Sequence, residues 1–279
     1  LLDYAYAAIR FWAYIQEKDG SFNDLYVHEH SLVAGAFSTY AISESLCIID
    51  DNKLTKEISP YLKKSARYLV SHDNARIENQ ETGVIIALHN LGDIFSDSEL
   101  KIKSEERCRR LINRLEPYFN EYGGFDVGYH TLSIDYLAKY YQKNPLPELK
   151  EFLIKACEYL SYFIHPDGST GGEYGSRNTA YIVPHGFTIC SSFSEQAKGI
   201  LVWLYKVLED KSAVLPYSMD SKYLLHNAYT LLQAKNDLKN VLWKDKDVIK
   251  KLPIEKEFQN FDSNNNLGKL WKNSALIDM

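Results

Sequence analysis

The feature that most constrains the fold is an alternation of two kinds of helical pattern, repeated about every 50 residues. Nearly continuous apolar patterns begin near residues 31, 81, 129 and 187, and a more amphipathic pattern precedes each of them. A helix that is apolar all round is typical of a buried inner helix, whereas an amphipathic helix covers a core from outside. The sequence therefore predicts an all-α protein: an (α/α) toroid, incomplete as a ring, of about 9 to 10 helices, with an open α-solenoid as the alternative.

This pattern also predicts the domain organisation. Residues 1–240 form the toroid domain, and residues 241–279, rich in Lys, Asp and Asn, form a C-terminal extension or linker. The helices that we expect cover residues 2–17, 32–49, 56–70, 81–91, 98–115, 129–141, 147–165, 187–208 and 221–235.

The polar loops share one position in the repeat. Each joins the end of an outer helix to the start of an inner one, so in a toroid all of them lie on one face. The inner helices point their N-termini at that face, with free N–H groups and a partial positive charge. Such a mouth favours anions, including carboxylates.

The longest polar loop runs from Pro166 to Gly186 and contains five glycines. Loops of this length that are ordered are usually functional, and its side chains suit the binding of a sugar or a carboxylate. The candidate substrate-binding residues are Glu173, Tyr174, Arg177, Asn178 and His185, and Tyr181 is a candidate catalytic residue. Two alternatives remain: the loop is a Gly-rich surface excursion, or Glu173 pairs with Arg177 to hold it.

Other candidates precede or open inner helices. His30, Asn79 and Gln80 are expected to bind substrate, although each can equally serve as a helix-capping or structural residue. Tyr129 and His130 follow a double-glycine turn, and both side chains can transfer protons.

Composition excludes several classes of function. The net charge of −5 argues against a large nucleic-acid interface, which needs a basic face. The four cysteines form no C-x-x-C pair, and His28-x-His30 has no third ligand at helical spacing, so we expect no metal and no cofactor. We find neither an apolar run long enough for a membrane span nor a signal peptide, and we expect a cytoplasmic or periplasmic protein. The 21 tyrosines suit clefts that stack against sugars.

Two motifs carry a resemblance to known families. Asp19-Gly20-Ser21-Phe22 looks like the helix–DG–helix units of (α/α) toroids, terpene cyclases included, although the clustered aspartates of the cyclases are absent. Asp167-Gly168 with Glu173, Ser176 and Tyr181, together with Gly128-Tyr129-His130, resembles the heparinase II/III-like and alginate-lyase group of polysaccharide lyases. The resemblance covers residues 1–235 in architecture.

That resemblance implies a mechanism and partners. In this group an Asn or Gln and a His neutralise the uronate carboxylate, and a Tyr, with a His, transfers protons. Asn79 or Gln80 would then bind the carboxylate, and Tyr129, His130 or Tyr181 would transfer protons. The Asn-His pair of the lyases reads Asn79-Gln80 here. A C-terminal β-sandwich is implied as a further partner.

We therefore expect a toroid that binds an acidic, uronate-containing oligo- or polysaccharide and cleaves it by β-elimination. The alternatives are a glycoside hydrolase on the same ring and a non-catalytic glycan-binding or scaffold domain. The hydrolase needs two carboxylates, for which Asp24, Asp126, Asp167 and Glu173 are available.

Overall fold

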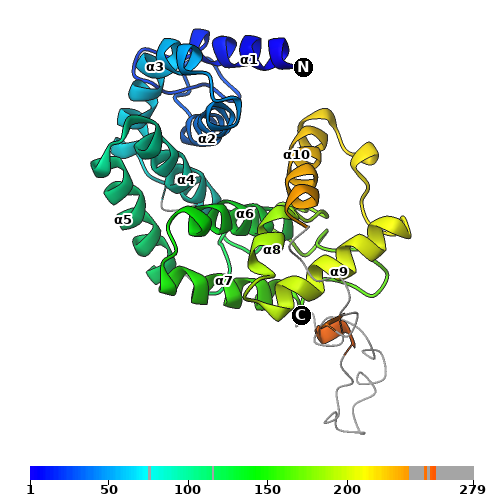
Figure 1. Ribbon diagram of the computed structural model, residues 1–279. Helices are drawn as coiled ribbons and strands as arrows, with labels where there is room; N and C mark the ends of the chain where they lie inside the picture. Colours follow the sequence, from blue (N-terminus) through cyan, green and yellow to red (C-terminus); the bar gives the residue numbers. More distant parts are fainter. Residues whose placement is uncertain (75–76, 115, 239–247, 250–251, 256–279) are drawn as a thin grey trace, which may run out of the picture. The chain divides into compact units, whose positions relative to one another are not determined.

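The computed structural model describes residues 1–74, 77–114, 116–238, 248–249 and 252–255 (Figure 1). Within these residues the chain is all-helical, with ten α-helices, three isolated β-bridges between loop residues and no β-strand. The chain divides into two compact units, residues 1–114 and residues 115–279. The sequence predicted one domain over residues 1–240 and an extension after it.

Unit 1 contains five helices. They are α1 (Leu2–Tyr14), α2 (Leu32–Ile49), α3 (Asn52–Ser71), α4 (Glu78–Phe95) and α5 (Ser98–Arg114). Helix α4 is buried along residues 78–92 and packs against both α2 and α5, as an inner helix should. The core is completed by apolar residues of α1 and α3, among them Trp12, Ile58 and Leu62. Prediction and structure agree on these five helices to within a few residues at most ends.

Helix α2 bears on the expectation of no membrane span. Among the described residues it is the one helix long and apolar enough to cross a membrane by length and composition, with a mean hydropathy of 1.5. A third of it is buried inside the protein, where it packs on α3 and α4. Core helices pass the same test, so the absence of a span stays a prediction.

Unit 2 contains the other five α-helices. They are α6 (Val127–Lys143), α7 (Pro147–Leu160), α8 (His185–Cys190), α9 (Glu195–Glu209) and α10 (Ser221–Asp237), with short 3₁₀ turns η1 (Pro216–Ser218) and η4 (Pro253–Glu255). Helix α6 is buried along most of its length and packs against α7 and α8 (Figure 1). Helix α10 packs against α8.

The prediction of one helix over residues 187–208 is wrong. Two helices, α8 and α9, meet at residues 191–194 instead. Ser191 and Ser192 donate side-chain hydrogen bonds to carbonyl oxygens of α8, and Ser194 caps α9 by accepting from Ala197 N at 3.2 Å. Serines compete with the helical backbone for its hydrogen bonds and favour caps, which explains the break inside an apolar pattern.

Part of the predicted C-terminal extension packs in the core of unit 2. Val248, Leu252 and Ile254 are buried. A Cβ added at Gly199 of α9 would meet Leu252, which places this segment directly on that helix. The rest of residues 241–279 lies outside the described residues.

Candidate functional site

The buried carboxylate of Asp126 organises a polar site in unit 2. Asp126 is the N-cap of α6, and its Oδ1 accepts from Tyr129 N at 3.2 Å. The same carboxylate accepts from Arg177 N at 3.0 Å, from Thr179 N at 3.2 Å and from the Thr179 hydroxyl. Asp126 therefore attaches the long central loop to the start of α6. In the sequence, only its position before the helix indicates this role.

Close backbone packing strengthens this attachment. Gly128 N donates to Thr179 Oγ1 at 2.6 Å, and a Cβ at Gly128 would collide with the Thr179 side chain. A Cβ at Gly171, where φ is 64°, would collide with the Thr179 carbonyl oxygen. Glycine is required at both positions, which accounts for part of the glycine content of this region.

The fixed loop holds Arg177 among tyrosines. Its guanidinium carbon lies 4.6 Å from the ring centre of Tyr122 and 5.6 Å from that of Tyr129. The Tyr129 hydroxyl faces Tyr223 of α10, and the Tyr181 and Tyr223 rings lie 5.5 Å apart. We call this group, formed by Arg177, Tyr122, Tyr129, Tyr181 and Tyr223, the Arg177 site. Two of its five members, Tyr122 and Tyr223, were missed in the sequence.

Burial raises the pKa of two phenols of this site, those of Tyr129 and Tyr181, so both stay protonated at neutral pH. Burial, together with Tyr223, raises the pKa of Tyr129 to about 12, although the positive charge of Arg177 opposes the change. Burial also raises the pKa of Tyr181, and Tyr223 and Tyr129 add to the effect. Both tyrosines are thus hydrogen-bond donors and potential general acids, while Arg177 remains a cation.

His130 takes no part in this site. Its side chain is fully buried, packs against Phe119, Phe125 and Tyr159, and donates from Nε2 to Ala156 O at 3.0 Å. Burial lowers its pKa to about 4, so it is neutral at neutral pH. A side chain enclosed in this way cannot reach a substrate, and we remove His130 from the candidate catalytic residues.

The other candidates in the central loop differ in their surroundings. Glu173 is exposed. The guanidinium of Arg177 lies against the rings of Tyr122 and Tyr129. The Tyr174 hydroxyl accepts from Gly171 N at 2.9 Å and lies 3.1 Å from His165 Nε2, so it ties the loop to itself. Asn178 has a φ of 56°, and with its amide nitrogen turned towards Gly172 and Gly175 it donates to both carbonyl oxygens.

His185 belongs to a buried charged network rather than to the Arg177 site. Its Nε2 lies 2.6 Å from Asp237 Oδ2 and its Nδ1 lies 3.7 Å from Asp135 Oδ1. Asp135 is fully buried and binds Lys139 Nζ at 2.5 Å. The network links α6, α8 and α10.

The three candidates in unit 1 are His30, Asn79 and Gln80, and the structure places them in contacts within the protein or in its interior. His30 Nδ1 lies 2.8 Å from both Asp19 Oδ2 and Ser21 Oγ, and so holds the Asp19-Gly20-Ser21 turn. Asn79 is buried, and Gln80 accepts from Asn74 Nδ2 at 3.1 Å. Helix α4 begins at Glu78 with Ile77 as its N-cap, so neither amide caps it.

Two of the four carboxylates named for a hydrolase, Asp126 and Asp167, are engaged in hydrogen bonds within the protein. Asp126 accepts hydrogen bonds from backbone N–H groups and from the Thr179 hydroxyl. Asp167 accepts from Ser169 N at 2.9 Å and from Ser169 Oγ at 2.7 Å. The described residues contain no group of three or more His, Cys, Asp or Glu that could hold a metal ion.

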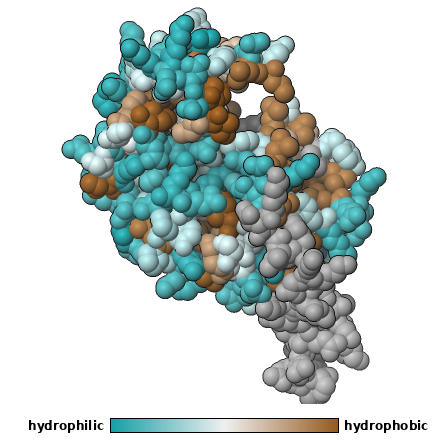
Figure 2. Space-filling view, in the orientation of Figure 1, coloured by the Kyte–Doolittle hydropathy of each residue, from teal (hydrophilic) through white to brown (hydrophobic). Residues whose placement is uncertain are grey.

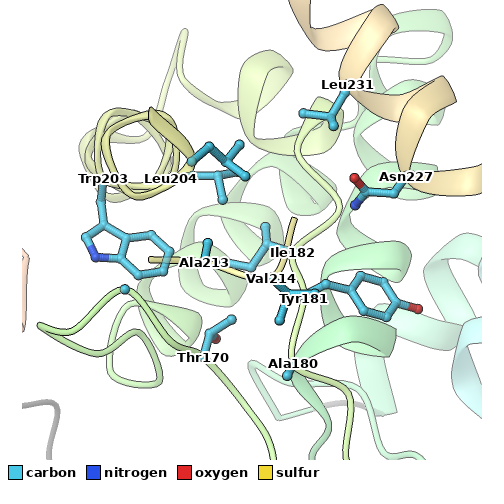
Figure 3. Close-up of a pocket in the computed structure, with 12 residues that line it drawn as sticks. Thr170, Ala180, Tyr181, Ile182, Trp203, Leu204, Ala213, Val214, Asn227 and Leu231 are labelled. Atoms are coloured by element: carbon cyan, nitrogen blue, oxygen red, sulfur yellow. The ribbon is translucent and has the colours of Figure 1, made fainter. Parts of the chain in front are cut away.

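A small cavity adjoins the Arg177 site. Figure 3 shows Tyr181 and Ile182 of the loop beside Trp203 and Leu204 of α9 and Asn227 and Leu231 of α10. Its volume of about 20 Å³ accommodates about one water molecule, which is too little for a sugar.

Comparisons of the chain with models of protein families, with curated proteins and with solved structures found no match.

Proposed function

We propose that unit 2 binds an acidic saccharide at the Arg177 site. The observation that carries this proposal is the placement of an exposed Arg177 over two tyrosine rings, on a loop attached to α6 by the buried Asp126. A charged side chain held in one place before binding loses less conformational entropy when a ligand arrives. An arginine fixed in this way is preorganised for an anion.

The chemistry of the site matches a uronate. A guanidinium can donate two parallel hydrogen bonds to a carboxylate. Tyrosine offers an apolar ring to the C–H face of a sugar and a hydroxyl to its polar edge.

The catalytic form of the proposal is β-elimination. Arg177 would neutralise the carboxylate and so acidify the C5 proton. The phenolate form of Tyr129 or Tyr181 would take that proton, and the resulting phenol would return it to the departing glycosidic oxygen. Loss of the C5 proton and of the C4–O bond leaves a C4–C5 double bond. The proposed architecture is the (α/α) toroid of polysaccharide lyases, supported by the alternation of amphipathic helices with buried α4 and α6.

A non-catalytic glycan-binding module is the second candidate. The raised pKa of Tyr129, about 12, favours it. A phenol with this pKa is almost never deprotonated near pH 7, so Tyr129 is a weak general base for removing the C5 proton. The two candidates share the binding step and differ only in turnover.

The test is calorimetric titration with short oligomers of galacturonate, mannuronate and glucuronate, with a neutral cello-oligosaccharide as the comparison ligand. We expect saturable binding of at least one uronate and at least a tenfold weaker Kd in Arg177→Gln, equivalent to about 1.4 kcal/mol. Arg109→Gln is the matched control, because Arg109 is an exposed arginine of α5 paired with Glu105. No binding of any uronate, or an unchanged Kd in Arg177→Gln, would overturn the proposal.

Turnover is followed by the ultraviolet absorbance of the unsaturated product. The lyase candidate predicts a growing absorbance that Tyr129→Phe reduces while Kd changes little. Binding of a uronate without any absorbance change in the wild-type protein selects the glycan-binding candidate instead.

A further inference from the structure

Helix α10 contributes a residue to the Arg177 site although it packs loosely. Tyr223, near its start, faces Tyr129 and contacts the Tyr181 ring. Without α10 the site would lose the aromatic ring that joins Tyr129 of α6 to Tyr181 of the central loop. The geometry of the site therefore depends on where α10 lies.

The buried side of α10 is unusually polar. Its buried residues are Asn227, Thr230 and Ala234, whereas Leu225 is 71% exposed and Leu232 is 66% exposed. Figure 2 shows hydrophobic atoms on the surface along this helix. Helix α9, by contrast, buries Ile200, Leu201 and Trp203. Apolar burial is the main source of helix docking, so α10 needs other interactions to hold it.

The interface beneath α10 is also incompletely filled. Asn227 and Leu231 of α10 line the cavity of about 20 Å³ that lies beside Tyr181 (Figure 3). A void deprives the atoms around it of dispersion contacts. The contacts between α10 and the loop are therefore incomplete around Asn227 and Leu231.

The network of His185, Asp237, Asp135 and Lys139 at the C-terminal end of α10 supplies polar contacts that can hold this helix in place of apolar packing. His185 Nε2 and Asp237 Oδ2 are 2.6 Å apart, and His185 is buried on α8 against Asp135 of α6. Lys139, bound to Asp135, also lies 5.4 Å from the ring centre of Tyr229 of α10. Short hydrogen bonds between ionisable groups are the stronger kind, and this one is shielded from water on the His185 side.

We propose that Tyr223 is a ligand-contacting residue of the Arg177 site, and that His185 and Asp237 are positioning residues that hold α10 so that Tyr223 reaches it. The role of Tyr223 rests on the proposed function, whereas the role of His185 and Asp237 is a property of the unliganded protein. The hydrogen bond at the end of α10 thus decides whether the aromatic site at its beginning is complete.

The experiment uses the full chain and the variants Tyr223→Phe, Asp237→Asn and Asp237→Glu. Asp210→Asn is the matched control, because Asp210 is the C-cap of α9 and lies outside the network. Asp237 is 41% exposed at a helix end, so its replacement leaves the apolar core intact. Hydrogen exchange over residues 221–237 and the titration of the Tyr129 phenol, followed by ¹³C NMR of labelled tyrosine, report on docking without a ligand. Calorimetry with oligogalacturonate, oligomannuronate and oligoglucuronate reports on binding.

We expect Asp237→Asn to speed exchange in α10 at least tenfold and to lower the pKa of Tyr129 from about 12 towards 10, because burial and Tyr223 both raise it. Asp237→Glu should restore part of both values, since it keeps the carboxylate. Asp210→Asn should change neither. Unchanged exchange and an unchanged pKa in Asp237→Asn would overturn the positioning role.

The binding measurement separates this inference from the proposed function. If the wild-type protein binds a uronate, Tyr223→Phe and Asp237→Asn should each weaken Kd at least threefold, and an unchanged Kd in Tyr223→Phe would overturn its contact role. If no uronate binds, the proposed function fails and the contact role of Tyr223 fails with it. The docking results then still decide the role of Asp237.

Discussion

The start of α4 and the start of α6 carry similar polar residues and use them in opposite ways. At α4, Glu78, Asn79, Gln80 and Glu81 are all buried, and Glu81 forms an ion pair with Arg107 that is 3.0 Å long. At α6, a buried Asp126 holds a loop whose Arg177 remains exposed over tyrosine rings. At α4 the Glu81 carboxylate is paired with a buried cation inside the protein. At α6 the Arg177 cation is exposed to solvent and can meet a ligand.

The comparison teaches that position at a helix N-terminus does not decide function. Arg107 donates to Leu69 O at 2.9 Å and His72 O at 2.6 Å, near the end of α3, besides holding Glu81. It satisfies carbonyl groups that the end of a helix leaves without partners. The polar residues at the start of α4 therefore connect α4 to the end of α3 through Arg107. The start of α6 is the better candidate for ligand binding.

The largest loss of stability should come from removing the ion pair between Arg107 and Glu81 at the start of α4. Arg107→Met leaves Glu81 as an uncompensated buried charge and should lower the free energy of unfolding of unit 1 by about 3–5 kcal/mol. Denaturant-dependent hydrogen exchange over residues 78–95 measures this. Arg110→Met is the control, because Arg110 is exposed and pairs with Asp73 at 3.5 Å, and it should cost less than about 1 kcal/mol. Equal losses in the two variants would contradict the structural role of Arg107.

An intermediate effect tests whether the inner face of α6 is structural as well. The folded protein holds the pKa of His130 at about 4 through burial, against an ordinary value of 6.5. As the pH falls from about 6.5 to 4, the unfolded chain binds a proton that the folded chain does not, so stability decreases, by about 3 kcal/mol in total.

Urea unfolding at a series of pH values measures this dependence. His130→Phe, which preserves an aromatic side chain among Phe119, Phe125 and Tyr159, should remove that part of the decrease. The same pH dependence in His130→Phe and wild type would show that His130 is accessible to protons in the folded protein, and would return it to the candidate site.

The smallest effect concerns the exposed loop residue Glu173. Because Tyr122 and Tyr129 surround the guanidinium of Arg177, we expect Glu173→Ala to change the free energy of unfolding by less than about 0.5 kcal/mol. Its Kd for a uronate oligomer should stay within about twofold of wild type by calorimetry. A tenfold weaker Kd would instead place Glu173 in the binding site. Exposed carboxylates, as well as Arg177, would then distinguish this region from the start of α4.

Prediction from the sequence succeeded where the signal was local. The starts and types of the helices in unit 1 follow from apolar periodicity, because a helix that must be buried shows it in its own residues. The same reasoning failed at residues 187–208, where serines within an apolar pattern end α8 and begin α9. Side-chain competition for the backbone is visible in the residue types, but whether it breaks a helix depends on the packing around it.

The candidate site was predicted only in part for a related reason. Arg177 and Tyr181 were recognised because they lie in the central loop, and Tyr129 because it follows a double-glycine turn, whereas Tyr223 lies far along the chain on α10. Asn79, Gln80 and His130 carried the same kind of signal as Tyr129, and their burial could not be read from it.

The sequence by itself determined that the described residues are helical, that α4 and α6 are buried, and that a glycine-rich loop follows the fourth outer helix. These properties depend on the order of apolar, polar and glycine residues along the chain, and each helix expresses them locally. Only the tertiary structure decided which polar side chains are enclosed and which remain free. That outcome depends on contacts between distant segments, such as Asp126 with Thr179 and His185 with Asp237, whose geometry no local pattern contains.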